Sequence, residues 1–413
     1  MPRAGPPTAR LLRAEPHELP ALGWAFAYFF LLLAAYYVLR PVRDAMAVQV
    51  GSAALQALFA YTFLAMLALV PVYGWLFARL PRARFLPVVY GFFILNLVCF
   101  YLFPDPKVFF VWLSVFNLFA VSVFWSLMAD IFDRAQAARL FGAIAAGGSC
   151  GAIAGPALTA ALAKQLGAAN MLLVSAFLLG LSLACLFRLN AWSRRYPRKG
   201  EPPAEAPLGG SVLAGLKAAL SSPYLLAICG WLFCYTVLST ALYFLQVEIV
   251  PKAIPDRAWQ LQFFATVDLA VNTLALVLQL FVTARLGAAI GVGWMLALMP
   301  LFSLAGFAVL GLAPTLAILL VVGVTRRAGE FAISKPVREA LYTVVPREER
   351  YKAKSFIDTV VYRGGDASSG WIFGSLRKAG FDPAALAWSA LPVAAAWLAL
   401  SFWLGRRAAE RRG

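Results

Sequence analysis

The sequence contains few charged residues and a single histidine. Asp, Glu, Lys and Arg make up 13% of the 413 residues, whereas soluble domains contain about 25%. The lone histidine and the five cysteines, none of which form a C-x-x-C pair, argue against a metal site or a disulfide framework. Hydrophobic residues make up 62% of the chain, more than a soluble protein could bury, so we expect side chains that face lipid.

Motifs of nucleotide hydrolysis and of catalysis are also absent. There is no G-x-x-x-x-G-K-[ST] phosphate loop, so we expect no ATP hydrolysis by this chain. No D-D-x-x-D carboxylate pair occurs, and His17 precedes the first apolar stretch, so we expect neither an enzyme nor a cofactor. The net charge of +17 is spread over short segments between apolar stretches, which indicates membrane topology rather than binding of nucleic acid.

Apolar stretches of membrane-spanning length recur along the whole chain. A spanning helix needs roughly 20 apolar residues. Twelve stretches qualify: 22–39, 53–78, 85–103, 108–129, 142–163, 169–188, 222–249, 261–284, 288–311, 314–334, 355–376 and 385–405. The one long polar segment, 189–218, is rich in Arg, Pro and Glu and is typical of a linker. We therefore predict an all-α polytopic membrane protein with six-helix halves at 1–188 and 219–413.

The distribution of Lys and Arg predicts the orientation. These residues gather in the segments that share a side with the N-terminus, so we expect both termini in the cytoplasm. The halves look related, since Gly147-Gly148 and Gly364-Gly365 occupy equivalent places after the fourth helix of each half. Six plus six helices around a central linker is the layout of major-facilitator-type transporters, whose halves enclose a site in mid-membrane.

Charged side chains at the end of the first apolar stretch are the first candidate site. Arg40 and Arg43 flank Pro41, and Asp44 follows. Pro41 predicts that the helix ends or kinks there. Two guanidinium groups in this position suit an anionic substrate, while the alternative is an anchor to lipid headgroups.

The eighth apolar stretch contains a second candidate. Asp268 and Asn272 lie four residues apart, so they share one face of a helix. An acidic residue inside a membrane is costly and suggests a face that lines a pore. The alternative is a set of hydrogen bonds that joins neighbouring helices.

The eleventh stretch holds the densest group of charges. Arg363 and Asp366 are spaced to form an ion pair, and Asp358 precedes them. Gly364 and Gly365 predict a bend or an unwound point between them. We expect a role in substrate binding or gating, with a structural ion pair as the alternative.

Several motifs together resemble the ATP:ADP antiporter family. They are Tyr37-Val-Leu-Arg-Pro-Val-Arg-Asp44, Ser122-Val-Phe-Trp-Ser-Leu-Met-Ala-Asp130, Lys335-Pro-Val-Arg-Glu-Ala-Leu-Tyr342, and the stretch from Tyr351 to Asp366. The resemblance implies a twelve-helix fold that exchanges nucleotides, with Arg40, Arg43 and Asp44 at the basic motif that ends the family's first helix. Where the family has an acidic residue in its fourth helix, this sequence has Asn117.

These observations lead to one expected function and to alternatives. We expect a monomeric inner-membrane transporter of a bacterium that moves a small organic anion, with ATP and ADP as candidates, by alternating access. Its partners would be the lipid bilayer and the solute, without nucleic acid or metal. Asp130, Arg338 and Glu339 would form a cytoplasmic gate. A scaffold or sensor that retains the fold is the alternative, and an enzyme built on an Asp268–Asp366 pair has less support.

Overall fold

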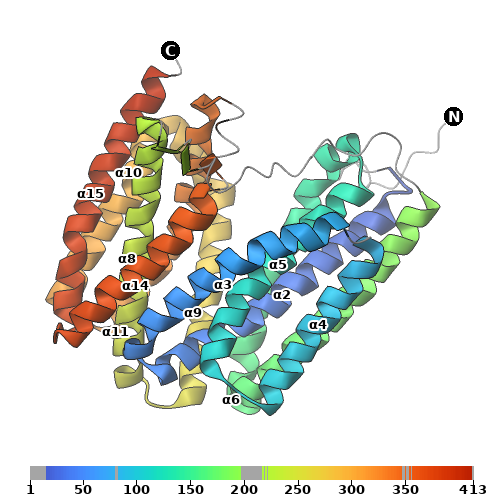
Figure 1. The fold of residues 1–413 in the computed structure, drawn as a ribbon, viewed down its shortest axis with the longest axis horizontal. Coiled ribbons are helices and arrows are strands. Elements are labelled where there is room, and N and C mark those ends of the chain that lie inside the picture. Colours follow the sequence, from blue (N-terminus) through green and yellow to red (C-terminus); the bar gives the residue numbers. More distant parts are fainter. Residues whose placement is uncertain are drawn as a thin grey trace. The chain divides into compact units, whose positions relative to one another are not determined.

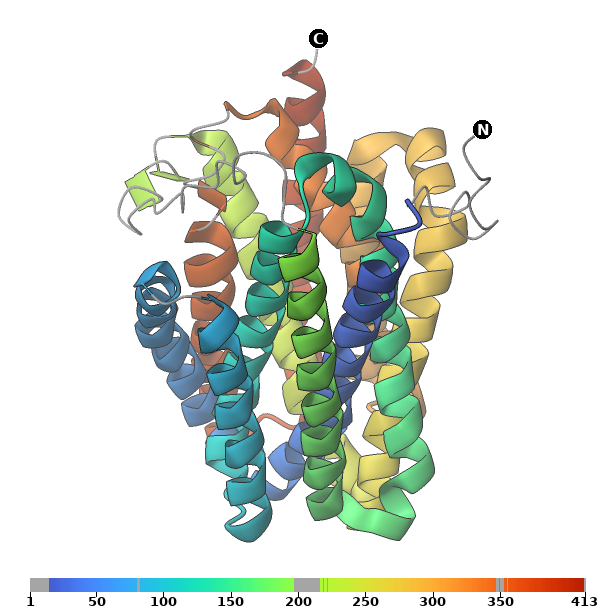
Figure 2. The same cartoon turned by 90° about the vertical axis from the view of Figure 1, so that its right-hand side faces the viewer.

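The computed structural model describes residues 15–79, 82–196, 216–217, 219–220, 222–346, 349, 353–354 and 356–411. In these residues the chain is helical and contains no strand, and the helices form bundles (Figure 1; Figure 2). The first elements are α2 (Leu19–Val50), α3 (Ser52–Arg79), α4 (Arg82–Leu102), α5 (Pro106–Ile131) and α6 (Arg134–Arg195). After them come α8 (Pro223–Ala253), α9 (Arg257–Val277), η1 (Leu278–Val282), α10 (Thr283–Leu312), α11 (Leu316–Gly329), η2 (Glu330–Ser334), α12 (Lys335–Leu341), η3 (Tyr342–Val344), η4 (Ile357–Val361), α14 (Tyr362–Lys378) and α15 (Pro383–Glu410).

Each of the twelve predicted spans falls on a helix. Two spans, 142–163 and 169–188, lie in the single element α6, which turns at Gly167. The break between 261–284 and 288–311 falls near Gly291 in α10. Both glycines have a φ of 72°, a left-handed conformation that residues with a side chain adopt only with strain. These two turns therefore join successive membrane spans in one continuous element.

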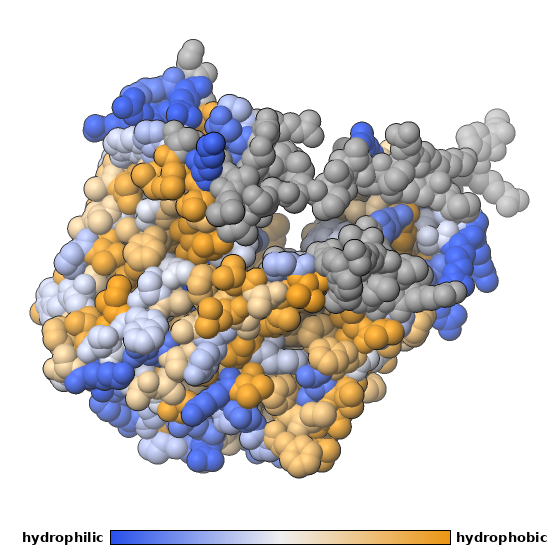
Figure 3. Space-filling model, viewed as in Figure 1, coloured by the Kyte–Doolittle hydropathy of each residue, from blue (hydrophilic) through white to orange (hydrophobic). Residues whose placement is uncertain are grey.

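The described helices have the length and polarity of membrane spans. Seven of the described stretches are long and apolar enough to cross a bilayer, and Leu86–Leu102 of α4 is a shorter apolar helix. Large apolar side chains cover the outer surface: Val88, Phe92 and Leu95 of α4 are 68%, 56% and 60% exposed. Apolar residues likewise spread over the face in Figure 3. A polytopic all-α membrane protein is confirmed, because only lipid accommodates so much exposed apolar surface.

The described residues belong to two compact units. Unit 1 comprises residues within Met1–Ala45, Ala68–Glu205 and Arg257–Leu269, and unit 2 comprises those within Met46–Leu67, Ala206–Asp256 and Ala270–Gly413. Three helices are divided: α2 and α9 begin in unit 1 and end in unit 2, while α3 begins in unit 2 and ends in unit 1. Within the predicted 189–218 linker, α6 continues to Arg195, and residues 197–215 lie outside the described part of the chain.

Aromatic side chains fill the core of each unit. In unit 1 the ring of Phe29 stacks on that of Phe124, with ring centroids 4.1 Å apart, and the Tyr28 hydroxyl donates to the Tyr90 hydroxyl at 2.6 Å. In unit 2 the buried Trp231 donates its indole N–H to the Ser401 hydroxyl at 2.8 Å. These hydroxyl and indole groups inside the two bundles thus bond to each other, as an interior embedded in lipid requires.

A row of glycines lets α6 lie directly against α2 in unit 1. A Cβ atom added at Gly147, Gly151 or Gly155 would collide with backbone atoms of α2, including the carbonyl oxygens of Phe26 and Phe30. Small residues at a spacing of four permit this close approach between membrane helices. Gly142 lies in the same helix, but a Cβ atom added there would meet no atom within 4 Å. The glycine row is therefore a packing surface.

Gly151→Ala tests this close contact, with Gly142→Ala as the matched control. We expect Gly151→Ala to lower the free energy of unfolding by about 2 kcal/mol, since the added methyl group overpacks the interface. Gly142→Ala fills open space and should be neutral or stabilising by up to about 1 kcal/mol. Thermal unfolding in detergent measures both, and equal stability of the two variants would contradict the packing role.

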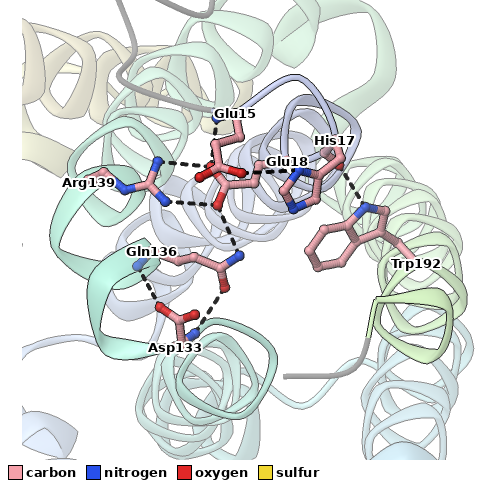
Figure 4. Close-up of polar contacts among 7 residues, drawn as sticks. All are labelled: Glu15, His17, Glu18, Asp133, Gln136, Arg139 and Trp192. Carbon is pink, nitrogen blue, oxygen red and sulfur yellow. Dashed lines mark hydrogen bonds and ion pairs between the residues drawn. The ribbon is translucent and has the colours of Figure 1, made fainter. Parts of the chain in front are cut away.

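A polar cluster fastens the start of α2 to both ends of α6 in unit 1 (Figure 4). The buried carboxylate of Glu18 accepts hydrogen bonds from both terminal nitrogens of Arg139, at 3.0 and 2.9 Å, and from Gln136 Nε2 at 3.0 Å. Asp133 and Gln136 form a capping box at the start of α6. Near the other end of α6, Trp192 donates to the backbone oxygen of His17 at 3.0 Å.

The charge on Glu18 should stabilise the protein above acidic pH. Burial raises the pKa of Glu18, but the hydrogen bonds from Arg139 outweigh it and hold this pKa below its usual value. The stabilisation is therefore complete above the unfolded-state pKa of about 4.3 and lost as pH falls through the lower folded-state pKa. Glu18→Gln should cost about 2 kcal/mol at neutral pH. The melting temperatures of the wild type and of Glu18→Gln should become equal below about pH 4. A difference between the two melting temperatures that stays constant down to acidic pH would contradict this account.

Candidate functional site

A buried ion pair joins α2 to the first half of α9 in unit 1. The Arg40 Nε atom lies 3.6 Å from Asp268 Oδ2, and the Asp268 side chain is 1% exposed. This distance is longer than a hydrogen bond, and Arg40 Nε has no hydrogen-bond partner in the described residues. The guanidinium also lies over the ring of Tyr37, 5.8 Å from its centroid. Two of the predicted site residues, from distant segments of the sequence, are thus brought together.

Of the two outcomes predicted at Pro41, an end of the helix is wrong, while a kink stays a prediction. The α2 helix continues through Pro41 to Val50, so Arg40, Arg43 and Asp44 lie inside a helix rather than at its end. Pro41 removes only one backbone hydrogen bond, and neighbouring helices packed around α2 support the chain on both sides of it. The consequence is that these three charged residues follow one another along a single helix.

Arg43 is held by its own sequence neighbour. Its Nη2 and Nε atoms donate to Asp44 Oδ1 at 2.7 and 3.0 Å. The guanidinium also lies over the ring of Phe110 in α5, 5.3 Å from the centroid. Arg43 and Asp44 side chains are 16% and 6% exposed, so the pair is mostly buried. A second paired guanidinium therefore lies one turn of α2 beyond Arg40.

The two predicted asparagines lie in different settings. Asn272 follows Asp268 by one turn of α9 and is half-buried, but it falls in unit 2 while Asp268 falls in unit 1. Asn117 is half-buried on α5, and within the described residues no hydrogen bond of its side chain is found. A role of either asparagine in the site therefore stays a prediction.

The charges of the eleventh span form two separate pairs in unit 2. Arg363 Nη1 lies 3.6 Å from Asp366 Oδ2 within α14, as the spacing predicted. Asp358, in η4, pairs instead with Arg338 of α12 at 3.4 Å. Arg338 is 6% exposed, so it lies in the interior rather than on the surface.

The unwound point predicted at Gly364-Gly365 is wrong, and the bend given as its alternative stays a prediction. The α14 helix runs through both glycines, and the irregular turn is the π-helix η4, one turn earlier at Ile357–Val361. A Cβ atom at Gly365 would collide with the Thr236 side chain of α8. Gly365 therefore permits close packing of α14 against α8, and the irregular backbone lies in the wider π-helix η4.

The remaining gate candidates lie near helix ends. Glu339 of α12 accepts from Lys354 Nζ at 2.5 Å, and both side chains are exposed by more than a third. Asp130 is exposed in the last turn of α5. These residues have the exposure of surface contacts, in contrast to the buried Arg338.

Two charged residues of the tenth span were missed by the sequence analysis. Arg326 of α11 is 2% exposed; its Nη1 donates to the Ser239 hydroxyl at 2.8 Å and its Nη2 to the Tyr235 backbone oxygen at 2.9 Å. Glu330 follows by four residues and begins the π-helix η2. The signal was present, since 314–334 contains Arg326, Arg327 and Glu330 within an otherwise apolar run.

Comparison with known proteins decides the family. The sequence profile of the Major Facilitator Superfamily matches residues 24–250, more than half of the 413 residues. The chain belongs to the Major Facilitator Superfamily. No curated protein sequence matches this chain.

Solved transporter structures share the fold of this superfamily member. A bacterial homologue of the human lysosomal transporter Spinster is 15% identical, with a TM-score of 0.66 over 96% of this chain and 99% of that chain. The nucleoside transporter NupG is 14% identical, with a TM-score of 0.63 over 94% and 98%. A bacterial homologue of the iron transporter ferroportin is 12% identical, with a TM-score of 0.68 over 94% and 99%. At these identities the likeness shows a multi-pass transporter fold and leaves the solute open.

Arg40→Ala should destabilise the folded protein, because it leaves the buried Asp268 carboxylate without this arginine. Removal of one partner of a buried pair costs about 3 kcal/mol. Adding Asp268→Asn to Arg40→Ala removes the charge and should recover much of the loss. Thermal unfolding of the two single variants and the double variant in detergent measures the coupling, and strictly additive effects would contradict a direct pair.

Proposed function

We propose that this superfamily member is a secondary transporter that moves a small organic anion across a bacterial inner membrane by alternating access. The observation that carries the proposal is the Arg40–Asp268 pair. A buried ion pair costs desolvation, and here its atoms are 3.6 Å apart rather than at hydrogen-bond distance. Such a pair is suited to exchange, with an anion taking the place of the carboxylate on Arg40.

The divided helices support the alternating-access part of the proposal. Asp268 lies at the end of the α9 segment that belongs to unit 1, immediately before the residues that belong to unit 2. A substrate that takes the place of Asp268 on Arg40 would break this contact. It would therefore free α9 close to the residue at which this helix passes from unit 1 to unit 2. Binding of the substrate at Arg40 is in this way coupled to the packing of α9.

Aromatic groups beside the arginines favour an anion with an aromatic part. Tyr36 and Tyr37 pack edge to face, with centroids 5.1 Å apart, and Tyr37 faces the Arg40 guanidinium. Stacking surfaces next to a cation suit a base attached to a phosphate. Together with the resemblance to ATP:ADP antiporters, this makes ATP and ADP the first solutes to test. We further propose a monomer with both termini in the cytoplasm, as the distribution of Lys and Arg favours.

Counterflow of labelled ATP and ADP in proteoliposomes tests the proposed function, with phosphate and a panel of organic anions as competitors. We expect saturable exchange that Arg40→Ala and Arg43→Ala abolish while the protein stays folded in the membrane. Arg407→Ala is the matched control, because Arg407 is exposed and forms an ion pair with Glu410 in α15.

Each result of this assay has a defined meaning. Exchange of another anion without ATP or ADP flux would discard the nucleotide and keep the transporter. Normal exchange by Arg40→Ala and Arg43→Ala would overturn the assignment of the site. Absence of any flux from folded protein would favour a scaffold or sensor.

A further inference from the structure

The π-helix η2 presents an acidic residue in the interior of unit 2. Glu330 opens η2 between α11 and α12, and its side chain is half-buried. The π-turn is rare and is often found where function requires an irregular helix. A carboxyl group at this depth is expensive unless it is paired or works in transport.

The carboxyl group of Glu330 is incompletely bonded. Its Oε2 atom is buried and has no hydrogen-bond partner in the described residues. No Lys or Arg nitrogen lies within 4.0 Å of it in the part of the chain that the structure describes. The buried oxygen can therefore accept a proton or one further hydrogen bond.

The neighbouring charged groups have other contacts. Arg326 and Arg338 are near enough for their charges to act on Glu330, as is Lys335. Yet Arg326 donates to Ser239 and to the Tyr235 backbone, and Arg338 pairs with Asp358.

Two tyrosine side chains complete the surroundings. Glu330 acts electrostatically on the tyrosine hydroxyls of α8 and α14, Tyr235 and Tyr362, whose ring centroids are 6.2 Å apart. The η1 segment beside η2 contains no ionisable residue, and the only one in α10 is Arg285. Among the described residues, the charged groups that act on Glu330 are therefore cations, and no second carboxylate does so.

These surroundings suit a proton and not a metal ion. A bound metal cation needs several oxygen ligands, and the positive charges of Arg326, Lys335 and Arg338 act on this carboxylate. No described group of metal-ligating side chains includes Glu330. A proton needs only the one oxygen that lacks a partner.

We propose that Glu330 is the residue that binds and releases a coupling proton during transport, an inference that rests on the proposed transport function. When ionised, the carboxylate attracts Arg326 and Arg338, whose Nε atoms also lack hydrogen-bond partners. When protonated, it releases both arginines to their contacts with Ser239 and Asp358. The two forms thus stabilise different arrangements of η2, and solute binding that favours one of them is coupled to the proton.

Transport measurements separate this role from solute binding. Proteoliposomes with Glu330→Gln, and with Glu410→Gln as the exposed control, are compared for labelled ADP counterflow at equal pH and for ADP uptake driven by a pH gradient. We expect the ratio of gradient-driven uptake to counterflow to fall about tenfold in Glu330→Gln, within the usual range for coupled sites. Glu330→Asp, which keeps a titratable group, should retain gradient-driven uptake.

An unchanged ratio in Glu330→Gln would overturn the proposal. Loss of gradient-driven uptake in Glu330→Asp as well would also overturn it, because a carboxyl group would then not suffice.

An infrared titration keeps this test independent of the solute. We expect a carboxyl C=O band of the wild type that appears as pH is lowered, that persists in Glu410→Gln and is missing in Glu330→Gln. The same titrating bands in wild type and Glu330→Gln would overturn the proposal. Absence of ADP counterflow in every protein would instead reject the nucleotide of the proposed function, and the infrared result would still decide whether Glu330 takes up a proton.

Discussion

The interior of a bilayer offers no hydrogen-bond partner and poor solvation of charge, and the structure follows from this constraint. Backbone groups must bond within helices, so all of the described spans are helical. Charged side chains must find partners on neighbouring helices, so Arg40 lies beside Asp268 and Arg338 beside Asp358. The polar interior of each unit is accordingly a set of cross-links between helices, and changing a partner alters helix packing.

Ion pairs that join helices can also break, and the helices can then move apart. Arg40 and Asp268 join α2 to α9 close to the residue where α9 passes from unit 1 to unit 2. The charge of Arg338, which pairs with Asp358 of η4, acts on Glu330. In the proposals an anion would replace Asp268 on Arg40, and a proton would remove the negative charge of Glu330 that acts on Arg326 and Arg338. In the proposed mechanism no separate cofactor is required.

The sequence predicted the helices well because their signal is local. Apolar runs of spanning length place all twelve spans, and the glycines at spacing four indicate packing. The spacing predicted the pair of Arg363 and Asp366 within one helix. It could not predict which arginine Asp268 meets, since Arg40 is more than two hundred residues away. Pro41 and Gly364-Gly365 misled for a related reason: tertiary packing carries the helix through them. Arg326 and Glu330 were visible in the sequence, but their significance depends on Tyr235 and Ser239 of α8.

The central claim is that Arg40 exchanges Asp268 for an anionic substrate, and ligand-induced thermal stabilisation measures it directly. Melting temperatures of the wild type, Arg40→Ala and Asp268→Asn would be recorded with and without ADP, ATP and the competing anions. A ligand that binds the folded state raises the melting temperature. The account predicts a larger rise in Asp268→Asn than in the wild type, because the competing carboxylate is gone, and no rise in Arg40→Ala. An equal rise in all three proteins would contradict it.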